Sequence, residues 1–354
     1  MDIYINSTCP NSQNVWKKDS TMMAIILISI VINILIFLHN EKIAILLKLY
    51  DKPDNIRKLH KLNIPLTGGI IVLLNIFIVI IFLFIDNSYL EKIEIFQDKQ
   101  DLIIFSLSFM LFFLIGFFDD KYEISANKRF LIMIIILMPI VIFSENLLIG
   151  EIRLSFIEAK YILPTPISIF WTILCFLLFI NATNMFDGIN YQTSFFSIYI
   201  CIFFLINNYF TILFILIIIS LLSFLLLNHK NKAFLGDNGS YLLAFLFSYF
   251  FVKIYNQETD IYSDYIFLIM FVPGIDLIRL FITRISKGNY PFKPDRNHLH
   301  HILLRKHNLT TVNFIIQSLI ILPSLCGYYF GYTYLFLSFQ ILVYSSLILS
   351  YRKD

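Results

Sequence analysis

The chain has 354 residues, of which 58% are hydrophobic and 14% charged, and its formal net charge at pH 7 is +3. Soluble globular domains are about 45–50% apolar and about 25% charged, so this composition excludes an ordinary soluble domain. Such a small net charge also gives no reason to expect nucleic acid as a partner. The composition predicts an all-α, polytopic membrane protein.

Eleven apolar segments predict transmembrane helices, because a helix needs roughly 20 mostly apolar residues to cross the hydrocarbon. The first segment exceeds a typical signal-peptide core and lacks a small-residue cleavage site after it, so it predicts a membrane anchor. We expect one transmembrane domain over 22–350, between an external segment over 1–21 and a cytoplasmic tail over 351–354. In chain order, the predicted spans are 22–39, 66–85, 102–118, 130–144, 166–181, 192–207, 209–227, 240–255, 264–283, 312–330 and 332–350.

The distribution of Lys and Arg predicts the orientation of these spans, because cytoplasmic loops carry an excess of both residues. With the N-terminus outside, the cytoplasmic stretches hold 19 of the 27 Lys and Arg residues and the external stretches hold 6. We therefore expect an external N-terminus and a cytoplasmic C-terminus. The predicted cytoplasmic loops are 40–65, 119–129, 182–191, 228–239 and 284–311.

All the unusual polar motifs fall on the cytoplasmic side in this topology. The external loops show no comparable motif, so the polar residues predict a site built across several helix ends. The motifs are DKPDNIRKLHKLNIPLTGG (51–69), FFDDKYE (117–123), NATNMFDGIN (181–190), AFLGDNGS (233–240) and PFKPDRNHLHH (291–301).

Two adjacent carboxylates, Asp119 and Asp120, close the third predicted span. A single acid there would be explained as an anchor that holds a helix end in water. Acids near a bilayer boundary are nevertheless functional candidates, and two close like charges raise a pKa or attract a cation. Oxygen ligands suit Mg²⁺, which usually takes one or two protein carboxylates together with substrate phosphates. The pair therefore predicts a metal-assisted site.

Two further motifs add oxygen-bearing side chains. Asn181, Asn184, Asp187 and Asn190 follow one another at spacings of three, which places them on one face of a helix. Asp237 of GDNGS lies at or near the start of the eighth span. Capping explains an acid at a helix N-terminus, but the same positive end would also help to hold phosphate oxygens.

The last motif is basic and contains Arg296, His298, His300 and His301. Clustered imidazoles bind zinc in some proteins, but no cysteine or acid beyond Asp295 stands at a suitable spacing. Cationic or donor imidazoles beside Arg296 fit a diphosphate better.

A glycine pair, Gly68-Gly69, opens the second span and predicts close helix packing or the approach of backbone to a ligand. The polar face as a whole combines carboxylates and amides for a metal with cations for phosphates. It lies at the depth of a lipid headgroup. The residues thus predict phosphoryl chemistry between a water-soluble nucleotide and a membrane lipid.

Through these five ordered motifs, the chain resembles the bacterial polyprenyl-phosphate N-acetylhexosamine-1-phosphate transferases from about residue 22 to 310. This group is the WecA/TagO-like branch of glycosyltransferase family 4 and is more distantly similar to MraY. The resemblance implies transfer of an N-acetylhexosamine 1-phosphate, by default that of GlcNAc, from a UDP-sugar to undecaprenyl phosphate. UMP would be released in the first membrane step of O-antigen, capsule, teichoic acid or related glycan synthesis.

The resemblance also implies roles for individual residues. Asp119 would be the base or orienter of the lipid phosphate, supported by Asp120, and Asp237 would bind Mg²⁺ with Asn184 as a second ligand. Mn²⁺ would be a substitute cation. Phe234 matches an aromatic residue that stacks on uracil. The full set of substrate-binding residues implied is Lys61, Asp187, Asn190, Phe234, Arg296, His298, His300 and His301.

The chain departs from the family pattern at Tyr191 and Gln192, which replace Gly and Leu. This departure leaves the sugar open among GlcNAc, GalNAc and modified sugars such as N-acetylfucosamine or N-acetylquinovosamine. Two other classes are an anionic-solute transporter, which would place charges near the midplane, and a non-catalytic transferase-like scaffold. We expect a multi-pass protein of the inner (plasma) membrane whose active site faces the cytoplasm. A homodimer is compatible with the resemblance, although no interface is evident in the sequence.

Overall fold

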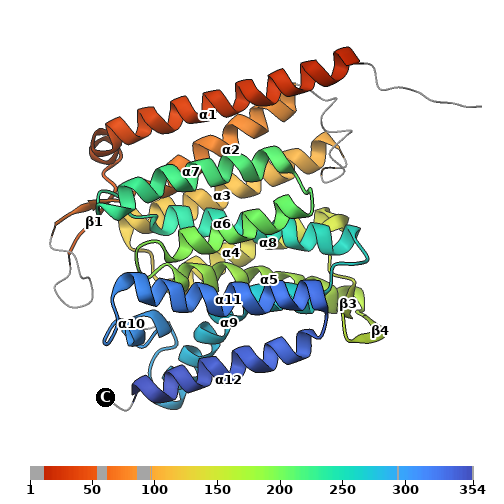
Figure 1. Ribbon diagram of the computed structural model, residues 1–354, viewed down its shortest axis with the longest axis vertical. Coiled ribbons are helices and arrows are strands. Elements are labelled where there is room, and N and C mark those ends of the chain that lie inside the picture. The colour runs from red at the N-terminus through yellow and green to blue at the C-terminus, as the bar shows by residue number, and fades with distance from the viewer. Residues whose placement is uncertain (1–11, 54–61, 86–95, 97, 293–294, 353–354) are drawn as a thin grey trace, which may run out of the picture.

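The computed structural model describes residues 12–53, 62–85, 96, 98–292 and 295–352, and it is a bundle of long helices (Figure 1). All eleven predicted segments are helical, which confirms the all-α class. The short helix α10 was not predicted. The helices are α1 (Ser12–Leu47), α2 (Gly68–Ile85), α3 (Lys99–Tyr122), α4 (Ala126–Phe143), α5 (Thr165–Phe186), α6 (Gln192–Ile206), α7 (Thr211–His229), α8 (Gly236–Gln257), α9 (Ser263–Ser286), α10 (Leu299–Leu303), α11 (Leu309–Phe330) and α12 (Thr333–Arg352).

Nine of the helices within the described ranges are long and apolar enough to cross a membrane. Two of the predicted spans, α6 and α8, are not among them; α6 has only 15 residues. Helix α8 packs mainly against α3 and α5, and every residue from Asn238 to Tyr255 is buried. Because protein surrounds α8, its polar residues need not face lipid. The chain is thus a multi-pass membrane protein, while the number and orientation of its crossings stay predictions.

Two short β-hairpins lie at opposite ends of the bundle (Figure 1). Strand β1 (Tyr50–Asp51) pairs with β2 (Ile64–Pro65), and β3 (Glu151–Leu154) pairs with β4 (Ile157–Ile162), both antiparallel. The end with β1 also carries α10 and the end of α12, whereas α1 begins at the other end. An odd number of crossings would produce this arrangement.

The glycine pair at the start of α2 allows that helix to touch the segment that leads into α8. Gly68 and Gly69 donate backbone hydrogen bonds to the carbonyls of Phe234 and Leu235, both at 3.1 Å. A Cβ atom on Gly69 would lie 1.9 Å from the side-chain oxygen of Asn238. The prediction of close packing at this pair is therefore confirmed, and the contact fixes the loop that precedes Asp237.

A buried ion pair joins α3 and α8 far from the acid motif at the other end of α3. Lys253 is fully buried and pairs with Asp101, whose carboxylate also accepts a hydrogen bond from Tyr249 at 3.1 Å. We expect Lys253→Met to lower the free energy of unfolding by about 3–5 kcal/mol, because Asp101 would remain as an unpaired buried charge. Thermal unfolding in detergent measures this loss.

The matched control is Lys160→Met, which removes a lysine that is 52% exposed and pairs with Glu151 on the surface. Exposed pairs contribute about 0–1 kcal/mol, so the control should unfold close to the wild-type temperature. If Lys253→Met also unfolded at that temperature, the pair would not stabilise the contact between α3 and α8.

Candidate active site

The two acidic motifs meet where α3 ends and α8 begins. Helix α3 runs to Tyr122 and ends at Glu123, whose φ of 50° is left-handed and whose N–H donates to the Asp119 carbonyl at 2.8 Å. The predicted loop 119–129 is therefore mostly helical, because α4 resumes at Ala126. Helix α8 begins at Gly236, which has a φ of 77°, and a Cβ there would lie 2.8 Å from an Asp120 oxygen.

Asp120 accepts three hydrogen bonds from the start of α8. The backbone N–H groups of Asp237 and Asn238 both donate to its carboxylate at 2.9 Å, and the side-chain amide of Asn238 donates as well. A carboxylate is favoured at a helix N-terminus because it satisfies free N–H groups and the helix dipole. These contacts indicate that Asp120 fixes the position of Asp237, while its predicted catalytic role stays a prediction.

Arg129, in the first turn of α4, lies between the other two acids. It forms an ion pair with Asp119, lies 3.4 Å from an oxygen of Asp237 and donates to the Tyr241 hydroxyl at 2.9 Å. Sequence reasoning missed this role and counted Arg129 only among the cytoplasmic cations. The sequence did contain one signal: Arg129 lies soon after the acid pair and immediately before the next predicted span.

The prediction that the four residues share one helical face is wrong beyond Asn184, because α5 ends at Phe186, before Asp187 and Asn190. Asn184 donates through its amide nitrogen to Asp237 at 2.6 Å and to the Ser240 hydroxyl at 2.8 Å. In this orientation it positions the Asp237 carboxylate, and it would bind a cation only with its amide turned. Asn181 donates to the Leu177 carbonyl of its own helix. Asn190, the last of the four, instead bonds residues at the end of α7.

The donor set suits a hard divalent cation. Among the described residues, no group of three or more His, Cys, Asp or Glu side chains is arranged to hold a metal. Mg²⁺ usually needs only one or two protein carboxylates, with substrate phosphates completing its shell. Asp119 and Asp237 provide two carboxylates for such a cation, and because the Arg129 guanidinium lies between them, Arg129 would have to move aside for one cation to contact both.

Asp187 follows α5 and lines the same cavity as Asp237. Burial is the main cause that raises the pKa of Asp187 to about 7; the nearby Thr193 hydroxyl lowers this pKa and the negative charge of Asp237 raises it. The protonated form of Asp187 is therefore favoured more than that of an ordinary aspartate. A neutral carboxyl can donate a hydrogen bond, which a carboxylate cannot.

One cavity of about 1760 Å³ brings most of the predicted residues together. Arg296 does not line it and is exposed, and Lys61 lies outside the described residues. The candidate residues that line the cavity are Asp119, Asp120, Asn184, Asp187, Asn190, Phe234, Asp237, His298, His300 and His301, with Arg129 in addition.

His300 is almost completely buried, with 2% of its surface exposed. Burial lowers its pKa well below the ordinary value of 6.5, and positive charge on His301 and His298 lowers it further. His300 is therefore neutral at pH 7. Of the two roles expected for these imidazoles, it fits that of a neutral hydrogen-bond donor and not that of a cation. Its Nε2 has no hydrogen-bond partner among the described residues and faces Gly188, where a Cβ atom would lie 2.1 Å away.

Comparison with known proteins gives a consistent result. The family model for Glycosyl transferase family 4 matches residues 102–255, from α3 to α8. The chain is 28% identical to the undecaprenyl-phosphate alpha-N-acetylglucosaminyl 1-phosphate transferase of Salmonella typhi, over 86% of this chain and 82% of that protein. The protein of the same name from Escherichia coli K12 is 29% identical, over 83% and 79%. A probable undecaprenyl-phosphate N-acetylglucosaminyl 1-phosphate transferase of Bacillus subtilis is 26% identical, over 75% and 72%.

Proposed function

We propose that this chain, which is similar to bacterial undecaprenyl-phosphate N-acetylglucosaminyl 1-phosphate transferases, transfers N-acetylglucosamine 1-phosphate from a UDP-sugar to undecaprenyl phosphate. The lipid product would start the synthesis of a membrane-linked glycan. One observation carries the proposal: Asp119, Arg129 and Asp237 share a cavity with three histidines at one end of a membrane bundle. The relatives give no support to a transporter or a scaffold.

The reaction exchanges one phosphoanhydride bond for another. An oxygen of undecaprenyl phosphate attacks the β-phosphorus of the UDP-sugar, the bond from that phosphorus to the bridging oxygen breaks, and UMP leaves. Such transfers depend mainly on positioning and on stabilising the charge of the non-bridging oxygens. Asp119 is assigned to orient the lipid phosphate, and Arg129 supplies positive charge beside it.

We also propose that Mg²⁺, with Mn²⁺ as a substitute, binds at Asp237 and Asp119. A bound Mg²⁺ would neutralise charge on diphosphate oxygens. Asn184 orients Asp237 through its hydrogen bond, and Asp120 holds the same residue through its backbone. The chain thus fixes this carboxylate from two helices before any substrate arrives.

The active site is assigned to the cytoplasmic side of the inner membrane. Residues of β1 and α10 line the cavity. These two elements lie at the same end of the bundle (Figure 1), where the loops are rich in Lys and Arg. UDP-sugars are cytoplasmic, and a lipid phosphate lies at the membrane boundary, so both substrates reach this depth. Dimerisation stays a prediction.

The activity is tested with purified protein, undecaprenyl phosphate and a panel of UDP-sugars. We expect UMP release with UDP-GlcNAc, and no release when the lipid phosphate is omitted. Faster release with UDP-GalNAc or a modified sugar would move the assignment to that sugar. No UMP with any donor, from protein that is folded, would overturn the proposal.

Gly188→Ala is expected to lower kcat about 100-fold, because the new methyl group would displace His300. A displacement of about 1 Å in an active site can cost about 100-fold in rate. UMP release measures the loss. The control is Gly150→Ala, since a Cβ at that position meets nothing within 4 Å. Equal activity of the two variants would show that the position of His300 does not matter for turnover.

A further inference from the structure

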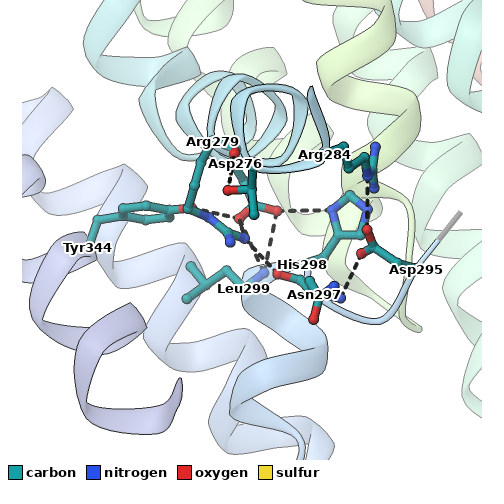
Figure 2. Close-up of polar contacts among 9 residues, drawn as sticks. Asp276, Arg279, Arg284, Asp295, Asn297, His298, Leu299 and Tyr344 are labelled. Atoms are coloured by element: carbon teal, nitrogen blue, oxygen red, sulfur yellow. Dashed lines mark hydrogen bonds and ion pairs between the residues drawn. The ribbon is translucent and has the colours of Figure 1, made fainter. Parts of the chain in front are cut away.

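Asp276, on α9, is a buried acid that lies outside the set predicted from the sequence. Four groups donate to its carboxylate (Figure 2). They are His298 Nδ1 at 2.9 Å, the Tyr344 hydroxyl at 2.7 Å, Arg279 Nη2 at 2.7 Å and the Leu299 backbone N–H at 3.2 Å. A buried acid within a membrane helix is costly unless it is paired. Asp276 is paired with the segment over 295–301, called the histidine loop below, and with side chains of α9 and α12.

The same network holds the loop on either side of His298. Arg279 also donates to the Asn297 carbonyl at 2.6 Å. Arg284, farther along α9, pairs with Asp295 at 2.8 Å, and Asp295 accepts from the Asn297 N–H at 2.8 Å (Figure 2). The loop is therefore attached to α9 through charged contacts at several successive residues.

The chemistry of the Asp276 contact fixes one feature of His298. An ionised carboxylate can only accept hydrogen bonds, so the proton of this hydrogen bond lies on His298 Nδ1. The other ring nitrogen, Nε2, then remains for a second partner. His298 lines the cavity that also holds Asp119 and Asp237. Carboxylates that contact a functional histidine in this way set its tautomer and its ring orientation.

We propose that Asp276 is a positioning residue for the transfer reaction, which holds His298 with Nδ1–H toward α9 and leaves Nε2 for a diphosphate oxygen in the cavity. This inference rests on the proposed function. Tyr344 and Arg279 hold the carboxylate in place from α12 and α9. Burying these charged groups between membrane helices costs free energy, and the proposed positioning of His298 gives a functional reason for keeping them there.

Asp276→Asn is the first test, because it keeps the shape of the side chain but allows an amide N–H to face His298. That amide favours a histidine that accepts at Nδ1, which is the wrong tautomer. We expect kcat for UMP release to fall about 10–100-fold, as for other partners that orient a functional histidine, with KM for UDP-GlcNAc within about threefold. The control is Asp264→Asn, which changes the other buried acid of α9, a residue bonded to Ser155. We expect the control to keep wild-type activity.

A double-mutant cycle separates positioning of His298 from general support of the loop. If Asp276 acts through His298, Asp276→Asn should change kcat less than about twofold in a His298→Ala background. A loss as large as in the wild-type background would overturn the inference, as would full activity of Asp276→Asn alone. Failure of the wild-type protein to release UMP would instead overturn the proposed function.

Nitrogen-15 NMR of histidine-labelled wild-type protein tests the same inference without a destabilising substitution. The His298 signal is assigned by its loss in His298→Gln. We expect a proton on Nδ1, whether or not Nε2 is also protonated. A resonance pattern in which Nδ1 carries no proton would overturn the inference even if Asp276→Asn could not be purified.

Discussion

Asp237→Asn is expected to lower the rate of UMP release about 1000-fold and to leave the protein folded. The substitution keeps the size of the side chain at the start of α8. It removes the negative charge of a carboxylate that lies 3.4 Å from Arg129 and accepts a hydrogen bond from Asn184 at 2.6 Å. It also removes a carboxylate assigned to Mg²⁺. Loss of one charge-stabilising group in an active site costs about 100- to 1000-fold, and here two functions share one group.

UMP release and thermal unfolding should be measured together on purified Asp237→Asn. Asp260→Asn, which changes an exposed acid in the connection between α8 and α9, serves as the control and should match the wild type in both measurements. More than a tenth of wild-type activity in Asp237→Asn would contradict the assignment of this carboxylate.

Asp119→Asn should also lower kcat by about 100- to 1000-fold, for a different reason. Asp119 is buried, with 5% of its surface exposed, and its carboxylate pairs with Arg129. Without that charge, Arg129 loses one of the two acids that hold it, and the lipid phosphate loses its assigned orienter. Removing a preorganised charge of this kind is costly at a phosphoryl-transfer site.

Steady-state kinetics with each substrate varied in turn tests the role of Asp119. We expect a large fall in kcat, a higher KM for undecaprenyl phosphate and a nearly unchanged KM for UDP-GlcNAc. Glu158→Gln, on the exposed strand β4, should behave as the wild type. If only the KM for UDP-GlcNAc rose, Asp119 would belong to the nucleotide side of the site.

The helices and the grouping of the polar motifs could be predicted because both depend on local composition. An apolar segment of about 20 residues specifies a membrane helix with little help from its neighbours. Polar motifs such as GDNGS stand out against that background. The positive-inside rule put the motifs on one side, and the single cavity lined by Asp119, Asn184, Asp237 and His300 agrees with that grouping.

What the sequence did not reveal depends on contacts between helices. Arg129 lies soon after the acid pair in the sequence, but its position between Asp119 and Asp237 depends on how α4 packs against α3. The buried, neutral state of His300 depends in the same way on its packing against Gly188. The sequence predicts Asp276 only as a residue of the span 264–283, because its partners come from elsewhere in the chain, on α12 and in the histidine loop.

Hydropathy also cannot separate a helix that faces lipid from one enclosed by protein. Helix α8 was predicted as an ordinary span over 240–255, yet it is buried on all sides and starts at Gly236. The four extra residues at its start are the GDNG of the acid motif. The backbone N–H groups of Asp237 and Asn238 donate to Asp120, so the start of the helix and the acid motif are the same structure.

The most direct test of the account uses UDP-GlcNAc that carries ³²P at the β-phosphate. It measures whether the protein transfers the labelled sugar phosphate to undecaprenyl phosphate. We expect the ³²P to appear in the organic-phase lipid, with unlabelled UMP released in equal amount, and neither product from Asp237→Asn. Label that stayed in the aqueous phase as UDP, or that never left the donor when folded wild-type protein was supplied with undecaprenyl phosphate, would contradict the account.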